Sequence, residues 1–465
     1  MTTLLDTAPP PSEPAVYRTR STRGRFDPAA LATTLAAAGL AEHCVLYERG
    51  DDWWYAAGVL CAVSVHHDRA VVRYGDQRIE HPYTGSPLRA LAELTADLPV
   101  MDWHGYGWLA FEFAQAHERP VALPRPGADP APLAQLVVPR VEARISTTSI
   151  DVRAVDDRTL DRVLDIAARL PGASCDRPPA GRRTPVDVHT PDGDAYRSAV
   201  ARAVERIEAG HLAKVILSRR VPVPFEVDLA RTCLHGRRAN TPARTFLLDL
   251  PGMRATGFSP ETVAEVDADG FVRTQPLAGT RALGLGGDRD RINRGELCTD
   301  PKELYEHAIS VRASDAELRT VCQPDSVAVR DFMSVRARGS VQHLGSHVEG
   351  RLRGGASCWD AIGVLFPAVT ASGIPKAAAC REIADLEPGA RGLYAGAVFQ
   401  VGHDGTLDAA LALRAVFTQD GRSWLRAGAG VVAGSRPDRE YTETCEKLAS
   451  IAPYLVAADA GGVRA

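Results

Sequence analysis

The chain alternates between segments with helical spacing of apolar residues and segments rich in β-branched and aromatic residues. In residues 194–210 (DAYRSAVARAVERIEAG), Val200, Val204 and Ile207 recur at helical spacing, and Gly210 follows in the position of a C-cap. This pattern predicts an amphipathic helix. Similar patterns predict further helices over residues 27–39, 301–322, 374–385 and 438–455.

Short apolar runs separated by polar turns predict the strands. They lie at residues 45–74, 136–155, 211–223, 245–250, 254–258, 262–273, 341–352, 391–402, 407–417 and 422–432. The sequence FQVGHDGTLDAALALRAVF places His403, Asp404 and Gly405 between two such runs, which is typical of a hairpin and so of antiparallel pairing. The expected fold is α/β, with large antiparallel sheets and helices packed on their outer faces.

Two proline-rich segments divide the chain. Residues 118–136 contain the run ERPVALPRPGADP, which predicts a loop, and residues 177–194 begin with RPPAGRRTP, which predicts a linker. We therefore expect a variable N-terminal half over 26–190 and a C-terminal half, richer in motifs, over 191–457. By length alone, 465 residues would suggest about three domains.

Composition excludes several functional classes. The formal net charge of −4 gives no electrostatic footprint for nucleic acid, and no run of eighteen apolar residues exists that could span a membrane. Nine cysteines without a C-x-x-C pair fit a reducing cytosol, so a cytoplasmic protein is expected. Residues 1–25 do not combine a basic start with an apolar run, so we expect a disordered tail, and residues 458–465 are expected to form a flexible C-terminal tail.

Two segments place glutamates three residues apart. On a helix, Glu440, Glu443 and Lys447 of EYTETCEKL fall within about 60° of one another, and Glu303 and Glu306 of DPKELYEHAISV repeat the arrangement beside an apolar stripe. Two such helices could bring four carboxylates together, which would require a cation between them, and a hard ion such as Mg²⁺ is suitable. Alternatively, both are solvated faces, and Glu443 and Lys447 form a surface pair that contributes about 0.3–0.5 kcal/mol.

Charged residues inside apolar runs are further candidates. Lys214 shares a strand face with Leu212 and Ile216. A partly buried lysine of this kind can act as a general base, whereas a lysine at a sheet edge keeps its ammonium in water. Arg414 in LALRAVF either meets a carboxylate or protects a sheet edge. His343 in VQHLGS is expected to be a core histidine held by a backbone carbonyl.

Small residues mark possible binding loops. In RAGAGVV, Gly428 and Gly430 would let another group approach the backbone closely, and exposed N–H groups there can hold a carboxylate; the alternative is a tight sheet corner. PLAGTRALG and FPAVTASGIPK are two more loops of small residues and hydroxyls. The run GLGG at 284–287 is not a dinucleotide fingerprint, because it does not link a strand to a helix, and there is no P-loop.

The motifs occur together in one order along the chain: AKVILSR, GFSPET, QPLAGTRA, DPKELYEHA, HLGS, FPAVTASGIPK, RGLYAGAV, LRAVF, RAGAGVV and EYTETCEKL. In this order they resemble the chorismate-utilising enzyme family, which includes anthranilate, aminodeoxychorismate, isochorismate and salicylate synthases. The resemblance is dense over 190–457 and weaker in the first half. It implies one large α/β domain like anthranilate synthase component I, spanning 26–457 with a catalytic half at 191–457, instead of three domains.

Within the family, the chain is most similar to the salicylate synthase branch, through FPAVTASGIPK, RALGLGGDRDR and TETCEKLASIAPYLV. Aminodeoxychorismate synthases carry a lysine where this chain has Ala278, and that lysine forms a covalent adduct with the ring. Lys214 stands where the water-using members carry their base. Gln275 departs from the branch, because a glutamate is expected before PLAGT, and the resemblance does not say what this change does.

The resemblance also implies roles for individual residues. Lys214 would deprotonate a water that attacks C2 of the chorismate ring, and Glu261 of GFSPET would protonate the departing C4 hydroxyl. Glu261 must therefore be kept protonated and Lys214 neutral. The implied metal site holds Mg²⁺, which binds the ring carboxylate, on Glu303, Glu306, Glu440 and Glu443. The implied substrate-binding residues are His343, Thr370, Tyr394, Arg414, Gly428 and Lys447.

The expected activity is Mg²⁺-dependent conversion of chorismate through isochorismate to salicylate and pyruvate, for a siderophore or another salicylate-derived natural product. The alternatives are an isochorismate synthase that stops at isochorismate, an ammonia-using enzyme of the anthranilate synthase type, and a noncatalytic chorismate-binding subunit. The intact set of Lys214, Glu261, Glu306 and Glu443 argues against the noncatalytic subunit. Chorismate is the expected small-molecule partner of a monomer, with no nucleic acid, membrane or glutaminase subunit.

Overall fold

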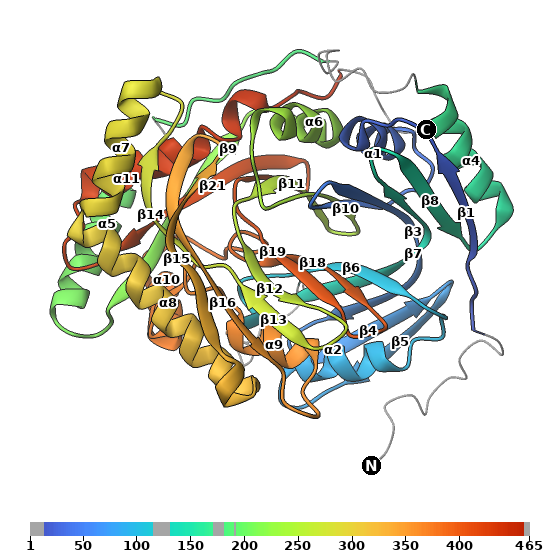
Figure 1. The fold of residues 1–465 in the computed structure, drawn as a ribbon, viewed down its shortest axis with the longest axis horizontal. Coiled ribbons are helices and arrows are strands. Elements are labelled where there is room, and N and C mark those ends of the chain that lie inside the picture. Colours follow the sequence, from blue (N-terminus) through green and yellow to red (C-terminus); the bar gives the residue numbers. More distant parts are fainter. Residues whose placement is uncertain (1–13, 115–130, 171–180, 190–191, 460–465) are drawn as a thin grey trace.

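The computed structural model describes residues 14–114, 131–170, 181–189 and 192–459 (Figure 1). The helices that concern the fold are α1 (Pro28–Ala37), α2 (Pro87–Ala96), α4 (Asp157–Arg169), α5 (Gly193–Glu208), α6 (Leu229–Ala239), α7 (Gly287–Thr299), α8 (Pro301–Val321), α9 (Cys358–Leu365), α10 (Lys376–Leu386) and α11 (Pro437–Leu448). Within the described ranges, none of them has the length and apolar character needed to cross a membrane.

The strands of the N-terminal half are β1 (Arg18–Arg23), β2 (Cys44–Arg49), β3 (Asp52–Val65), β4 (Arg69–Tyr74), β5 (Gln77–Pro82), β6 (His104–Leu109), β7 (Ala134–Ile145) and β8 (Ser149–Ala154). Those of the C-terminal half are β9 (Lys214–Val223), β10 (Arg244–Leu250), β11 (Met253–Ser259), β12 (Thr262–Val266), β13 (Phe271–Thr274), β14 (Leu277–Ala282), β15 (Ala328–Arg338), β16 (Val341–Arg351), β17 (Gly373–Ile374), β18 (Ala397–Gly402), β19 (Leu407–Leu411), β20 (Ala415–Gln419) and β21 (Arg422–Val431).

The two halves share one system of antiparallel strands. β9 pairs with β21, and the ladder continues through β20, β11 and β10 to the N-terminal strands β2, β3, β7 and β6. From β6 it returns to the C-terminal half through β18, β19, β12, β13 and β16. Because N-terminal strands lie between C-terminal ones, neither half could complete its sheet alone. The prediction of one α/β domain with antiparallel sheets is confirmed.

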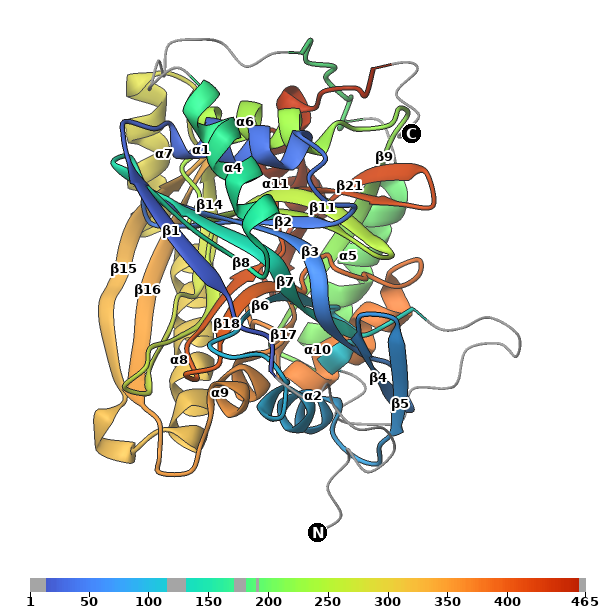
Figure 2. The ribbon, with the colours of Figure 1, turned by 90° about the vertical axis from the view of Figure 1, so that its right-hand side faces the viewer.

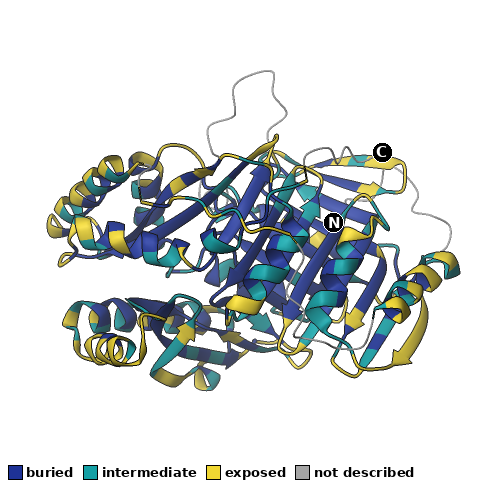
Figure 3. Cartoon of the chain, turned by 90° about the horizontal axis from the view of Figure 1, so that it is seen from above, coloured by how far each residue is buried: buried dark blue, intermediate teal, exposed yellow. Residues whose placement is uncertain are grey.

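Helices cover the outside of the sheets (Figures 1 and 2). α8 packs on β14 and β16, α11 on β21, α5 on β9 and α11, and α6 on β10 and β11. Viewed from above, the strands are mostly buried, whereas the outer faces of the helices are exposed (Figure 3). This arrangement brings the N-terminal turns of α8 and α11 to the same end of β14 and β21.

The predicted tails need correction. Residues 1–25 were expected to be disordered, yet β1 lies at Arg18–Arg23 and pairs along its whole length with β8. Strand pairing satisfies its backbone donors and acceptors although its side chains are exposed, so no apolar pattern reveals it. At the other end, the Ala458 amide donates to Glu226 O at 2.8 Å and Asp459 pairs with Arg231 at 2.9 Å. The rest of both predicted tails, and most of the loop predicted at 118–136, lie outside the described residues.

Several predicted segments are shorter or broken in the structure. The strand expected at 262–273 is the pair β12 and β13, and the strand expected at 391–402 begins only at Ala397. The strand expected at 407–417 is two strands, because Arg414 adopts a φ of +51° between β19 and β20. The helix expected at 438–455 ends with α11 at Leu448, and only a 3₁₀ turn at Ala452–Tyr454 follows. Pro453 lies in that turn, where its missing N–H prevents the helix from continuing. The hairpin predicted around Asp404 is confirmed by the pairing of β18 with β19.

Candidate active site

A cavity lies where β9, β14 and β21 meet the helices α8 and α11. It is concave and partly enclosed, and its wall mixes apolar residues with a few charged ones, as in small-molecule sites. The lining residues of the predicted site are Glu261, Glu306, His343, Thr370, Tyr394, Arg414, Gly428, Glu443 and Lys447. Segments separated by more than two hundred residues therefore converge on one pocket.

Glu261 is a buried carboxyl group with neutral partners. It follows β11, and its Oε2 accepts a hydrogen bond from the Leu277 amide at 2.9 Å. The Thr370 hydroxyl donates to its other oxygen. Burial raises the pKa of Glu261 to about 7, because these hydrogen bonds and the more distant charges of Lys214 and Arg414 offset only part of the lost hydration. The expectation that Glu261 is held partly protonated near neutral pH agrees with this environment.

Arg414 is a buried cation that faces the cavity. Its Nη1 donates to Arg338 O at 2.6 Å, and its Nη2 lies 2.5 Å from His343 Nε2. Within the described part of the chain, no carboxylate lies within ion-pair distance of Arg414. Neither alternative considered for this arginine holds, since it is not at an exposed edge and does not pair with a protein carboxylate. A buried guanidinium without a counter-anion favours binding of an anionic ligand.

His343 supports Arg414. Its Nδ1 lies 3.2 Å from Gly279 O and 3.2 Å from Thr280 Oγ1, so the prediction of a histidine held by a backbone carbonyl is confirmed. Burial and the charge of Arg414 lower the pKa of His343 well below its ordinary value. A neutral imidazole with Nδ1 protonated can accept from Arg414 through Nε2, and it then fixes the direction of the guanidinium.

Lys214 is fully buried at the start of β9, with 0% of its side chain exposed. Its Nζ donates to Ser310 Oγ at 3.0 Å and lies 3.0 Å from Glu306 Oε1. The snorkelling alternative is therefore wrong. Lys214 does not itself line the cavity. It adjoins the cavity through Glu306, its ion-pair partner, which does line it.

The four predicted metal ligands are all buried, so the alternative of two solvated helix faces is wrong. Glu303 and Glu306 lie in the first two turns of α8, where Asp300 caps the helix by accepting from the Lys302 and Glu303 amides. Glu440 and Glu443 occupy the corresponding turns of α11. The positive ends of both helix dipoles point at this cluster, which favours carboxylates there.

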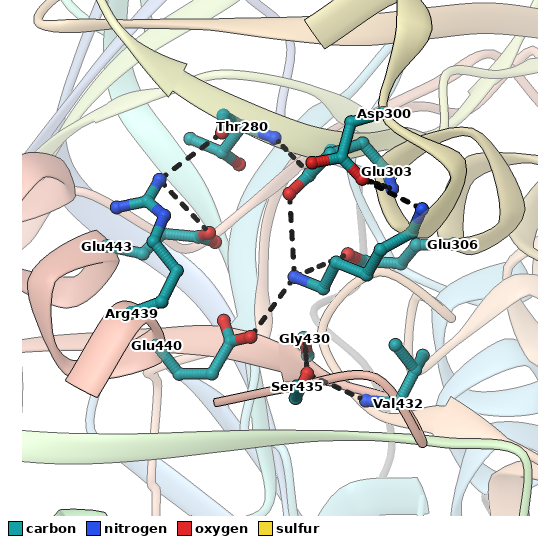
Figure 4. Close-up of polar contacts among 12 residues, drawn as sticks. Thr280, Asp300, Glu303, Glu306, Gly430, Val432, Ser435, Arg439, Glu440 and Glu443 are labelled. Carbon is teal, nitrogen blue, oxygen red and sulfur yellow. Dashed lines mark hydrogen bonds and ion pairs between the residues drawn. The ribbon is translucent and has the colours of Figure 1, made fainter. Parts of the chain in front are cut away.

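The centre of the cluster holds an ammonium group that the sequence analysis did not single out. Lys302 Nζ lies 3.1 Å from Glu440 Oε1, 3.6 Å from Glu303 Oε1 and 3.8 Å from Glu306 Oε2. Figure 4 labels these three glutamates, whose carboxylates point toward one another. Consistent with this, no three His, Cys, Asp or Glu side chains in the described ranges are grouped tightly enough to hold a metal ion together. Three of the four carboxylates therefore converge on Lys302, whereas Glu443 pairs with Lys447.

Each of the other carboxylates also has a cation of its own. Glu303 pairs with Arg281 at 2.8 Å and also accepts from the Thr280 amide at 2.8 Å. Glu443 pairs with Lys447 at 2.8 Å, and Glu306 pairs with Lys214. Within the described segments, Glu440 has only Lys302 within ion-pair distance, and its two oxygens accept no hydrogen bond of good geometry.

The acidities of the α11 pair differ strongly. Burial raises the pKa of Glu440 to about 7, and the neighbouring charge of Glu443 adds to this although Lys302 opposes it. Burial acts on Glu443 as well, but Lys447, Lys302 and Arg439 outweigh it and hold its pKa at about 2. Two carboxyl groups one helical turn apart therefore differ near neutral pH. Glu440 is partly protonated there, whereas Glu443 stays ionised.

Two features of the cluster fit a hard divalent cation. The donors are all carboxylate oxygens, which Mg²⁺ prefers, and the oxygens of Glu440 are buried without hydrogen bonds. In addition, a Cβ atom on Gly430 would lie 2.1 Å from Glu306 Oε1, so the missing side chain makes room for this carboxylate. The prediction that Gly430 permits a close approach to the backbone is confirmed, and the approaching group is Glu306.

Some predicted residues lie behind the wall, and some lining residues were missed. Lys214, Glu303 and Glu440 contact the lining or Lys302 without reaching the cavity themselves. Thr280 and Arg426 line the cavity although they were not predicted. Thr280 lies in PLAGTRALG and Arg426 lies in RAGAGVV, two motifs noted above for their small residues. A polar side chain within such a motif could have indicated that these two residues line the cavity.

The comparisons with known proteins agree with this geometry. Residues 42–453 match the family described as chorismate binding enzyme. The salicylate synthase of Mycolicibacterium paratuberculosis is 46% identical over 440 residues, which cover 93% of this chain and 94% of that protein.

Two solved structures share the fold. Anthranilate synthase component I from Streptococcus pneumoniae has a TM-score of 0.69 at 23% identity, covering 87% of this chain and 92% of that one. The menaquinone-specific isochorismate synthase from Escherichia coli has a TM-score of 0.68 at 22% identity, covering 96% of each chain. The matched family spans most of the chain and includes every predicted site residue. The protein is therefore an enzyme of the chorismate binding family.

Proposed function

We propose that the protein converts chorismate through isochorismate into salicylate and pyruvate, with Mg²⁺ as cofactor, and that the salicylate supplies a siderophore or a related natural product. One observation carries the proposal: a buried lysine, Lys214, and a carboxyl group of pKa about 7, Glu261, adjoin a single cavity that also contains the unpaired cation Arg414. The similarity to a salicylate synthase over most of the chain supports the choice of product.

The anionic substrate has complementary groups in the cavity. The enolpyruvyl carboxylate of chorismate would bind Arg414 and the Tyr394 hydroxyl, beside the backbone of Gly428, which has no side chain to obstruct it. Lys447, which donates to Gly428 O at 2.9 Å, adds positive charge on the same side. When bound, Mg²⁺ would attach to the carboxylates of Glu306 and Glu443 and neutralise the ring carboxylate of the substrate.

The first reaction exchanges one hydroxyl for another. Lys214, as the neutral amine, would take a proton from the water whose oxygen bonds to C2 of the ring. Lys214, whose Nζ lies 3.0 Å from Glu306 Oε1, must first lose its own proton to solvent to become this amine. Glu261 would give its proton to the C4 hydroxyl, which leaves as water while the double bond shifts. Water enters and water leaves, so isochorismate is an isomer of chorismate.

The second reaction needs no further acid or base. The hydrogen on C2 moves to the methylene carbon of the enolpyruvyl group as the C3–O bond breaks, which yields salicylate and pyruvate. An enclosed cavity that holds the side chain over the ring favours this intramolecular step. Ala278 lines the cavity where a covalent mechanism would need a lysine, so the wall at this position offers no competing nucleophile.

The test is to incubate the purified protein with chorismate and Mg²⁺, separate the products by chromatography, and measure pyruvate with lactate dehydrogenase. We expect salicylate and pyruvate in equal amounts, with loss of both in excess EDTA. Isochorismate without pyruvate would instead identify an isochorismate synthase. A product that forms only with ammonia would indicate an enzyme of the anthranilate synthase type. Chorismate that binds but remains unchanged would indicate a noncatalytic subunit.

A further inference from the structure

The chain uses lysine very sparingly, and where it does so is informative. Of its 54 lysine and arginine residues only four are lysines, namely Lys214, Lys302, Lys376 and Lys447. Three of the four contact Glu303, Glu306, Glu440 or Glu443, whereas Lys376 lies outside this cluster and pairs with Glu317, nearer the C-terminal end of α8, at 2.9 Å. A chain that otherwise uses arginine has kept the compact, flexible ammonium at this cluster.

The three lysines of the cluster differ in what they do. Lys214 pairs with Glu306 and donates a hydrogen bond to Ser310 Oγ at 3.0 Å. Lys447 pairs with Glu443 and donates to Gly428 O at 2.9 Å. Lys302 is instead shared among three carboxylates at 3.1–3.8 Å. Its contacts are longer and more numerous, as for an ion at the centre of a cage.

Lys302 also has a route out of the cluster. It is the second residue of α8, next to Pro301, and its side chain is 18% exposed, whereas that of Lys214 is 0% exposed. Departure of the ammonium leaves Glu303 paired with Arg281, but it leaves Glu440 without a cation among the described residues. The buried oxygens of Glu440 then need another positive charge.

We propose that Lys302 is an exchangeable internal cation, whose ammonium holds Glu303, Glu306 and Glu440 together in the metal-free protein and leaves when a divalent cation binds. The inference rests on the proposed Mg²⁺ dependence. An ammonium and a divalent ion cannot occupy the same few ångströms, because their repulsion is strong in a buried site. Lys302 therefore weakens metal binding by the substrate-free protein, and an anionic substrate that adds negative charge beside the cluster shifts the balance toward the metal.

Direct metal binding tests the exchange. Mn²⁺ is titrated into substrate-free protein and followed by electron paramagnetic resonance, and Mg²⁺ is titrated by calorimetry. We expect Lys302→Met, which removes the charge but keeps the length, to bind either ion at least about tenfold more tightly than wild type. Lys302→Arg, which keeps the charge, and Lys376→Met, which removes a lysine outside the cluster, are expected to bind like wild type.

Amine labelling of the wild-type protein gives a second readout that needs no variant. Reductive methylation followed by mass spectrometry can follow all four lysines separately. With saturating Mg²⁺ we expect Lys302 to be labelled several times faster, because its ammonium has moved to solvent, while the fully buried Lys214 stays protected. Labelling of Lys302 that Mg²⁺ leaves unchanged or slows would overturn the exchange, whether or not Lys302→Met folds.

The outcomes separate this inference from the proposed function. If neither ion binds wild type or Lys302→Met, with or without chorismate, the Mg²⁺ dependence itself is wrong. If the metal binds wild type but Lys302→Met binds equally or more weakly, Lys302 anchors the glutamates and is not exchanged. If Lys302→Arg binds as tightly as Lys302→Met, the size of the side chain matters and its charge does not. The last two results reject the exchange and leave the reaction intact.

Discussion

The cavity wall contains two glutamates that are equally buried yet opposite in acidity. Glu261 is 3% exposed and Glu443 is 4% exposed. Burial raises the pKa of Glu261 to about 7. Burial also acts on Glu443, but the charges of Lys447, Lys302 and Arg439 outweigh it and lower its pKa to about 2. Burial alone therefore does not decide the protonation state of a carboxyl group in this protein.

The difference lies in the partners of the two groups. Glu261 accepts hydrogen bonds from a backbone amide and the Thr370 hydroxyl, which are neutral and replace only part of its hydration. Glu443 meets the ammonium of Lys447 at 2.8 Å, which favours its ionised form. One side of the cavity thus keeps a proton available, and the other keeps a fixed negative charge. Lys214 connects them, since it pairs with Glu306 of the cluster and its charge lowers the pKa of Glu261.

Removal of the Lys214 side chain should have the largest effect on catalysis. We expect Lys214→Ala to reduce the formation of isochorismate and salicylate by about 10²–10⁴-fold, the usual contribution of a general base, with binding of chorismate largely kept. Turnover is measured by product chromatography and binding by calorimetry. Lys376→Ala, the lysine that pairs with Glu317 away from the cavity, is the matched control and should keep its turnover. Near-normal turnover of Lys214→Ala would show that another group activates the water.

The two glutamates should respond in opposite directions when each is made neutral. The low pKa of Glu443 stabilises the fold above the ordinary value of about 4.3, and this stabilisation is lost as the pH falls toward 2. At pH 7 in EDTA, Glu443→Gln should therefore lower the free energy of unfolding by on the order of 3 kcal/mol. The raised pKa of Glu261 destabilises the fold as the pH rises from about 4.3 through 7, so Glu261→Gln should raise stability at pH 8.

Urea unfolding of both variants at pH 5 and pH 8 checks these signs. Glu265→Gln serves as the control, because Glu265 lies on the neighbouring strand β12 and pairs with Arg244 outside the cavity. At pH 5 the Glu261→Gln variant should differ little from wild type, since Glu261 is already protonated there. Equal destabilisation of both variants at pH 8 would contradict the opposite pKa shifts inferred from the neutral partners of Glu261 and the cationic partners of Glu443.

The pH profile of catalysis gives a smaller, graded effect. A general acid works only while protonated, so loss of the proton from Glu261 above its pKa, which burial raises to about 7, should offset any gain in neutral Lys214, and kcat/KM should not rise further above pH 7. Initial rates of chorismate consumption between pH 6 and pH 9 test this. Glu265→Gln should leave the alkaline limb in place. A profile that continues to rise from pH 7 to pH 9 would mean that Glu261 does not supply the proton.

The same comparison shows what the sequence could predict. The spacing of Glu303 with Glu306 and of Glu440 with Glu443 predicted two helices with paired glutamates, but it left open whether these glutamates converge or face solvent. The family resemblance decided for convergence. Lys302 lies inside the quoted DPKELYEHA motif but was missed. It precedes Glu306 by four residues and so lies about 40° from it on a helical wheel. The spacing that singled out Lys447 beside Glu443 could therefore have identified Lys302 as well.

Other features depend on tertiary structure that no local pattern encodes. The break at Arg414 is a single residue with φ of +51° inside an apolar run, which periodicity reads as one strand. β1 consists of exposed residues, and its partner β8 lies more than a hundred residues away in the sequence. The order of the strands, in which N-terminal strands lie between C-terminal ones, likewise depends on long-range pairing. The fold class was predictable from local patterns, whereas these connections were not.

The smallest expected effect concerns Gln275, the departure from the salicylate synthase pattern. Its side-chain amide contacts His347 Nε2 at 2.8 Å, and it does not line the cavity. His347 in turn lies 3.5 Å from Asp331, so a carboxylate at position 275 would meet an imidazole that can accept a proton between two acids. We therefore expect Gln275→Glu to change kcat and KM by no more than about threefold, as for most substitutions that touch no reacting group. The ratio of salicylate to isochorismate should also stay constant, and a shift of tenfold in that ratio would instead place position 275 among the residues that select the product.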